Sequence, residues 1–236
     1  MDKVYFIAKK ELLTYFKSPI AYITLVLSIA IFNVFFFLII DQNREVSLRD
    51  VFHVMEFMFL FLVPMMTMRL FSEEKANGTM EFLMTAPVSN TAIVLGKYLG
   101  VLIFFSILIS LTLIYFVVIE FFGSPDRMTL VIGYFGVWLE GAFFIAIGMM
   151  TSSWTHNQII AAMMSYVILF FLYFVINFSA YFTGAAEGLI QYLSTLAHLE
   201  HFIVGVITVG DMVYYLSGIF ICIVFTRLSI ENRLFQ

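Results

Sequence analysis

Charged residues are scarce in this chain: Asp, Glu, Lys and Arg make up 12% of its 236 residues, whereas hydrophobic residues make up 62%. Water-soluble domains carry about 25% charged residues, so a soluble globular fold is excluded. The formal net charge of -4 leaves no basic patch, which argues against nucleic acid as a partner. Composition therefore predicts an all-α integral membrane protein that crosses the bilayer several times.

Several chemical signatures are also missing. Cys222 is the single cysteine, so no internal disulfide can form. No H-E-x-x-H motif occurs, and the His and Glu pairs are too sparse for an intramembrane metalloprotease or another metal site. The phosphate-binding loop G-x-x-x-x-G-K-[ST] is absent, because Gly96 and Lys97 lack the earlier Gly and Tyr98 stands where Ser or Thr is required. We expect no metal, no bound cofactor and no catalytic residue, and hence no enzyme activity from this chain alone.

Long apolar runs are abundant. The first run exceeds the roughly 7–15 apolar residues of a cleaved signal peptide, so we interpret it as a retained span. Windows of about 19 residues predict six spans within a single transmembrane domain, 1–236. They cover residues 19–40, 51–71, 92–121, 129–150, 158–178 and 212–228.

Lys and Arg residues indicate the orientation of the spans. With a cytoplasmic N-terminus, the inner side holds Lys3, Lys9, Lys10, Lys17, Arg69, Lys75, Lys97, Arg227 and Arg233. The outer side then holds Arg44, Arg49 and Arg127. This bias predicts a multi-pass protein of the inner (cytoplasmic) membrane with both termini in the cytoplasm. We expect Arg69 and Lys97 to reach the headgroups as interfacial anchors.

Two regions outside the spans have helical patterning. Residues 1–18 predict an amphipathic helix at the inner interface, with Lys3, Lys10 and Lys17 near anionic membrane lipids and an end at Ser18-Pro19. Docking of a cytoplasmic partner is a compatible alternative. Residues 179–211, between the fifth and sixth spans, contain no Lys or Arg and predict short outer helices.

A polar stretch interrupts the apolar runs at residues 69–90. It predicts a short cytoplasmic helix from Glu73 to Met84, with Ser72 as N-cap, a weak point at Gly78 and a stop at Pro87. On periodicity alone, an interfacial loop that merely connects two spans is the alternative.

The same stretch carries a family resemblance. The run E-E-K-A-N-G-T-M-E-F-L-M-T-A-P-V-S, followed by I-V-L-G-K-Y-L-G, resembles the signature of type-2 permease subunits of ABC transporters, with Met84 replacing a Leu. The early K-K-E-L-x-x-Y-F-x-S-P-I-A-Y resembles the gliding-motility-associated branch of these permeases. The late run from Leu193 to Ser217, which includes His198, Gly205 and Asp211, is similar to the same branch.

The resemblance implies a transmembrane subunit of an ATP-driven exporter. The helix after the second span would be its coupling helix, seated in a groove of a separate ATPase subunit that binds ATP and Mg²⁺. The residues that this implies for the contact are Glu73, Glu74, Lys75, Asn77, Gly78, Thr79 and Glu81. A second permease subunit, identical or related, is implied as well.

Small residues at Ala92, Gly96 and Gly100 form a stripe that permits close helix approach. The stripe predicts packing either against the second permease subunit or against another helix of the same chain.

Glu140 is the clearest ionisable residue inside a span, and we expect it to face protein or water. It is a candidate for the translocation path or gate, with a structural hydrogen bond to another helix as the alternative. Glu56 and His53 are further candidates for the translocation path or gate. They share a helix face, and we expect a local cluster with Arg44 and Arg49.

Other functions remain open at this point. Glu140 and Glu56 suit a stand-alone secondary transporter, although the two halves of the chain show no convincing self-similarity. A subunit that transmits mechanical force without cargo is a further alternative. Short outer loops and few charges in the spans favour a lipid-like or amphipathic substrate.

Overall fold

The computed structural model describes residues 2–43, 47–81, 88–123 and 125–231, which form helices without any strand. Six of the helices in these ranges have the length and apolar composition needed to cross a membrane, which confirms the predicted number of spans. The elements are α1 (Asp2–Lys17), α2 (Pro19–Asn43), α3 (Arg49–Thr67), α4 (Arg69–Ala76), α6 (Asn90–Thr112), α7 (Ile114–Phe122), α8 (Arg127–Trp154), α9 (Gln158–Phe174), η1 (Val175–Tyr181), α10 (Ala185–Leu193), α11 (Thr195–Ile203) and α12 (Val209–Glu231).

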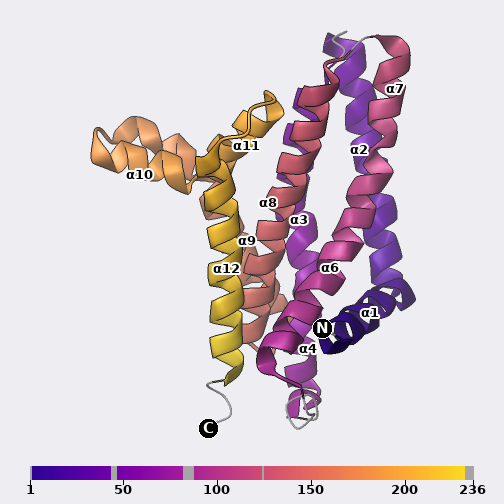
Figure 1. Ribbon diagram of the computed structural model, residues 1–236, viewed down its shortest axis with the longest axis vertical. Helices are drawn as coiled ribbons and strands as arrows, with labels where there is room; N and C mark the ends of the chain where they lie inside the picture. Colours follow the sequence, from indigo (N-terminus) through magenta and orange to yellow (C-terminus); the bar gives the residue numbers. More distant parts are fainter. Residues whose placement is uncertain (1, 44–46, 82–87, 124, 232–236) are drawn as a thin grey trace.

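The long helices stand side by side as a bundle (Figure 1). At one end of the bundle, α1 lies across α6 and near α4, and α12 ends at this same end. At the other end, α10 and α11 lie between the fifth and sixth spans, and α10 projects away from the bundle. Because the number of spans is even, α1 and the C-terminal end of α12 lie at the same end of the bundle.

The second span continues further than its sequence suggests. The chain passes through Pro64, and Met68 keeps helical backbone angles (φ −52°, ψ −32°), so α3 leads directly into α4. The apolar segment and the polar stretch after it therefore form one nearly continuous helix from Arg49 to Ala76. The predicted helix start at Ser72 is wrong, because this side chain lies inside α4 and donates to the carbonyl of Met68.

Helix α8 is the centre of the bundle. Its glycines admit large side chains from the helices around it: a Cβ on Gly141 would lie 2.1 Å from the Phe105 ring, and one on Gly133 would lie 2.4 Å from the Phe52 ring. Close packing of this kind is the usual source of stability between helices in a bilayer, where lipid tails are as apolar as the side chains. Large side chains of the surrounding helices therefore pack directly on the backbone of α8.

Helix α1 has two faces: one packs on α6, and another presents an exposed apolar surface. Ala8, Glu11 and Tyr15 are buried in the contact, whereas Tyr5 and Phe6 are exposed on another face. The exposed aromatic rings suit a helix at the membrane interface. The buried glutamate is unexpected for a helix that only rests on lipid, and it leads to the candidate site.

Candidate functional site

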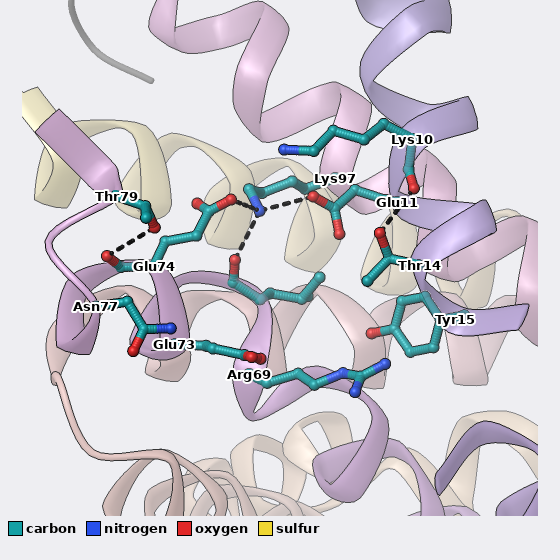
Figure 2. Close-up of a pocket in the computed structure, with 11 residues that line it drawn as sticks. Lys10, Glu11, Thr14, Tyr15, Arg69, Glu73, Glu74, Asn77, Thr79 and Lys97 are labelled. Carbon is teal, nitrogen blue, oxygen red and sulfur yellow. Dashed lines mark hydrogen bonds and ion pairs between the residues drawn. The ribbon is translucent and has the colours of Figure 1, made fainter. Parts of the chain in front are cut away.

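The candidate site lies at the end of the bundle where α1, α4 and α6 meet. A cavity of about 200 Å³ opens there between the polar side chains of the three helices (Figure 2). The turn after α4 forms part of its rim through Asn77 and Thr79. The polar stretch and the N-terminal helix therefore share one site.

Lys97 of α6 lies at the centre of the polar contacts in this site (Figure 2). Its Nζ lies 2.9 Å from Oε1 of Glu11 on α1, 2.8 Å from Oε1 of Glu74 on α4 and 2.8 Å from the carbonyl oxygen of Leu70. Lys97 is only 2% exposed, so these acceptors replace its water shell. The interpretation of Lys97 as an interfacial anchor is wrong, because two carboxylates from the same chain hold its ammonium group inside the protein.

Arg69 joins α4 to the connection between α1 and α2. Its Nη1 donates to Oγ of Ser18 over 3.1 Å, and its guanidinium lies 4.9 Å from the centre of the Tyr15 ring. The Tyr15 hydroxyl donates to the carbonyl of Met66 over 2.5 Å, and burial raises the pKa of this phenol. Arg69 therefore acts within the protein, and its predicted role as a headgroup anchor is wrong.

Helix α4 is also fastened to the central helix. Ser152 of α8 accepts hydrogen bonds from the backbone amides of Phe71 and Ser72, at 3.0 and 3.2 Å, and donates to Met68 over 2.8 Å. Lys75 is buried and donates from Nζ to the carbonyl of Ser153. A displacement of α4 would therefore be transmitted to α1, α6 and α8 together.

The segment after α4 presents an exposed polar surface. Asn77 ends the helix and Gly78 adopts a left-handed conformation (φ +68°), so the predicted continuous helix from Glu73 to Met84 is interrupted. Residues 82–87, including Met84 and Pro87, lie outside the described ranges. The exposed members of the predicted contact set are Glu73, Asn77, Gly78, Thr79 and Glu81, whereas Glu74 and Lys75 point inward to Lys97 and Ser153.

The small-residue stripe faces the same chain. A Cβ on Gly96 would lie 2.6 Å from the Cβ of Ile7, and one on Gly100 would lie 2.7 Å from the Cβ of Glu11. Ala92, at the start of the stripe, is partly buried. In this arrangement α1 covers both glycines, so they serve packing within the chain and are closed to a second permease subunit.

The ionisable residues predicted within the spans form a second polar region, further along the bundle. Glu56 of α3 and Glu140 of α8 are both 0% exposed. His53 lies 3.5 Å from Glu56 and 3.2 Å from Glu200, a residue of α11 that the sequence did not connect with it. Arg44, one of the expected partners, lies outside the described residues.

His198 and His201 meet at a third polar region, at the end of the bundle that carries α11. Asp211 at the start of α12 accepts from Nδ1 of His198 over 2.6 Å and from Nδ1 of His201 over 3.0 Å. His198 also contacts the carbonyl of Tyr192 through Nε2, at 2.9 Å. In the described ranges, no three or more His, Cys, Asp and Glu side chains are grouped as metal ligands would be.

These features define the class of protein. The six apolar helices and the buried polar contacts between them are those of a multi-pass membrane protein. The chain matches the model of the ABC-2 family transporter proteins over residues 5–229 and therefore belongs to that family. A search of curated proteins finds no match. The predicted type-2 ABC permease is confirmed at the level of the family, whose members are membrane components of ABC transporters and work with an ABC ATPase subunit.

Proposed function

We propose that this chain is the transmembrane permease subunit of an ATP-driven exporter and that α4 with the turn after it receives the movement of a separate ATPase subunit. The observation that carries this proposal is the attachment of Lys97 to both Glu11 and Glu74. A polar segment that only connected two spans would not need a buried lysine that joins it, through one shared ammonium group, to two other helices.

The proposed mechanism is a rigid-body movement. ATP and Mg²⁺ bind to the partner ATPase, and closure of two such subunits draws two permease chains together through their α4 segments. In each chain, Lys97 transmits the movement to α1 and α6, while Ser152 transmits it to α8. The second permease chain is identical to this one or closely related.

The orientation follows from charge. The end of the bundle that carries α1 and α4 holds most of the Lys and Arg residues, so this end faces the cytoplasm of a cell with an inner membrane. From the N-terminal and late runs, we also propose that the chain belongs to the gliding-motility-associated branch. This proposal describes the ancestry of the chain and does not identify its cargo. A lipid-like or amphipathic substrate suits spans with so few charges.

The exposed surface also specifies the chemistry of the partner. Glu73 and Glu81 are exposed, while Lys75 is buried, so the described part of this surface is acidic. We therefore expect the ATPase groove to offer Arg or Lys side chains opposite Glu73 and Glu81.

Affinity purification from native membranes in mild detergent tests the proposal. The wild-type chain should bring down an ATPase with a Walker motif, and Glu73→Lys with Glu81→Lys should reduce its recovery at least tenfold. Glu187→Lys, on α10 at the other end of the bundle, is the matched control and should recover the ATPase normally. If a well-expressed wild-type chain recovers no ATPase, the proposed function is wrong, and equal recovery by the double variant would place the contact elsewhere.

A further inference from the structure

Two buried carboxyl groups face each other inside the bundle. Phe52 of α3 packs against Gly133 of α8, and Thr67 packs against Gly148, so the two helices run in the same direction with matched spacing. Glu56 and Glu140 lie on these helices between the two contacts. Both residues are 0% exposed, and each carboxyl group lies within the electrostatic reach of the other.

Few groups around this pair can donate a hydrogen bond to it or balance its charge. None of the four carboxyl oxygens has another group at hydrogen-bonding geometry within the described part of the chain. The hydroxyl of Thr195 on α11 lies near Glu140 but does not reach hydrogen-bonding geometry. The titratable groups that act on the pair or on its neighbour His53 are Asp50 on α3, Tyr173 on α9, Glu200 on α11, and Tyr214 and Tyr215 on α12. No Lys or Arg is among them.

Two ionised carboxylates are not stable side by side in the buried interior of the bundle without a nearby Lys or Arg. Burial removes the water that would stabilise each charge, and the low dielectric strengthens the repulsion between them. Two carboxyl groups that share a site resolve this conflict by holding one proton between them, which one oxygen donates to the other. The proton then also supplies the hydrogen-bond donor that the pair lacks.

His53 connects the pair with the outer end of the bundle. Its Nδ1 lies 3.5 Å from Oε2 of Glu56, and its Nε2 lies 3.2 Å from Oε2 of Glu200. The side chains of His53 and Glu200 are 37% and 48% exposed, and His53 lies near the start of α3, so this part of the path opens at the end of the bundle. With a carboxylate at each ring nitrogen, His53 is placed to be an imidazolium that balances the remaining negative charge of the pair.

We propose that Glu56 and Glu140 form a proton-binding site within the membrane, reached from the outer end through Glu200 and His53 and occupied in the conformation described. The bound proton joins α3 to α8. Displacement of α11 would expose the pair to water and release the proton, so occupancy of the site is linked to the conformation of the outer end. This inference is independent of the ATPase contact.

Infrared difference spectroscopy on the purified chain in lipid nanodiscs tests the proposal. Subtracting the spectrum of Glu140→Gln from that of wild type should show loss of the carbonyl stretch of one protonated carboxylic acid per chain. Glu56→Gln should shift this band, because an amide replaces the carboxylate that accepts the proton. Glu187→Gln, on the exposed α10, is the control and should leave this band unchanged.

The role of His53 has its own readout. His53→Gln removes the balancing cation, so the protonated band should persist to higher pH than in wild type, whereas His201→Gln should leave its pH dependence unchanged. If Glu140→Gln does not fold, Glu140→Asp should retain the band at a shifted frequency. Spectra in which neither Glu140 variant nor Glu56→Gln alters a protonated-acid band would overturn the proposal, and an unchanged pH dependence in His53→Gln would overturn the path through His53.

Discussion

Lys97 of α6 and Glu11 of α1 form a buried ion pair, with 2.9 Å between Nζ and Oε1. The same ammonium group lies 2.8 Å from Oε1 of Glu74, so one side chain joins the N-terminal helix to the segment after the second span. The three side chains are 3%, 11% and 18% exposed. Such a cluster holds its helices in one relative position, which is what a force-transmitting junction requires.

Removing the cation should therefore be costly. Lys97→Met leaves Glu11 and Glu74 buried without a counter-charge, and we expect a loss of about 3–5 kcal/mol of stability. Thermal unfolding in detergent measures this effect. Arg227→Ala breaks only the exposed pair with Glu231 and should change stability by less than about 1 kcal/mol. Similar effects from the two substitutions would contradict the buried cluster.

Gly100 should be sensitive to any added side chain. A Cβ at this position meets Glu11 at 2.7 Å and the backbone oxygen of Ala8 at 3.1 Å, so Gly100→Val should force α1 away from α6. We expect a loss of about 1–3 kcal/mol, together with faster proteolysis of α1. Gly188→Ala, which meets nothing within 4 Å, is the control. Normal protection of α1 in Gly100→Val would show that the helices do not pack as described.

Tyr15 should contribute a pH-dependent part of stability. Burial raises the pKa of its phenol above the ordinary value of 10.0, so the folded state holds the proton more tightly than the unfolded state. This contribution is complete below about pH 10 and is lost as the pH rises further. Tyr15→Phe should cost about 1 kcal/mol at neutral pH through the lost bond to Met66, and its stability should fall less steeply above pH 10. Parallel stability curves for the two chains would contradict the assignment.

His198 should hold α10 and α11 in place. His198→Phe retains a ring that can stack on Tyr214, at 4.0 Å between centroids in the wild type, but loses the bonds to Asp211 and the Tyr192 carbonyl. We expect a loss of about 1–3 kcal/mol of local stability, seen as faster amide hydrogen exchange in α10 and α11. His201→Gln should have a smaller effect, because the His201 side chain is 52% exposed. Unchanged exchange in His198→Phe would contradict this role.

The sequence predicted the spans well because hydropathy over about 20 residues is strong evidence for a membrane helix. It was less informative about the ends of helices. Polar residues after Phe71 indicated a new helix, whereas Ser152 supplies bonds that let the second span continue to Ala76. Such bonds come from a residue about eighty positions away along the chain, and no local pattern shows them.

The partners of charged residues were also hidden from the sequence. Lys97 was expected to reach the headgroups because long basic side chains usually do so near the membrane boundary. Its burial depends on Glu11, which is far from Lys97 in the sequence, so the residues around Lys97 do not reveal this partner. In the same way, His53 has a second partner besides Glu56, namely Glu200 on α11, which only the folding of α10 and α11 brings near.

The most direct test of the account is a site-specific cross-link from the end of α4. Cys222 is the single native cysteine and is buried, so Asn77→Cys on the exposed turn can carry a photo-activated cross-linker alone. Leu189→Cys, which is 66% exposed on α10, serves as the control. In native membranes, we expect an adduct between residue 77 and a Walker-motif ATPase and none from residue 189. Efficient labelling at residue 77 without an ATPase adduct would contradict the central claim.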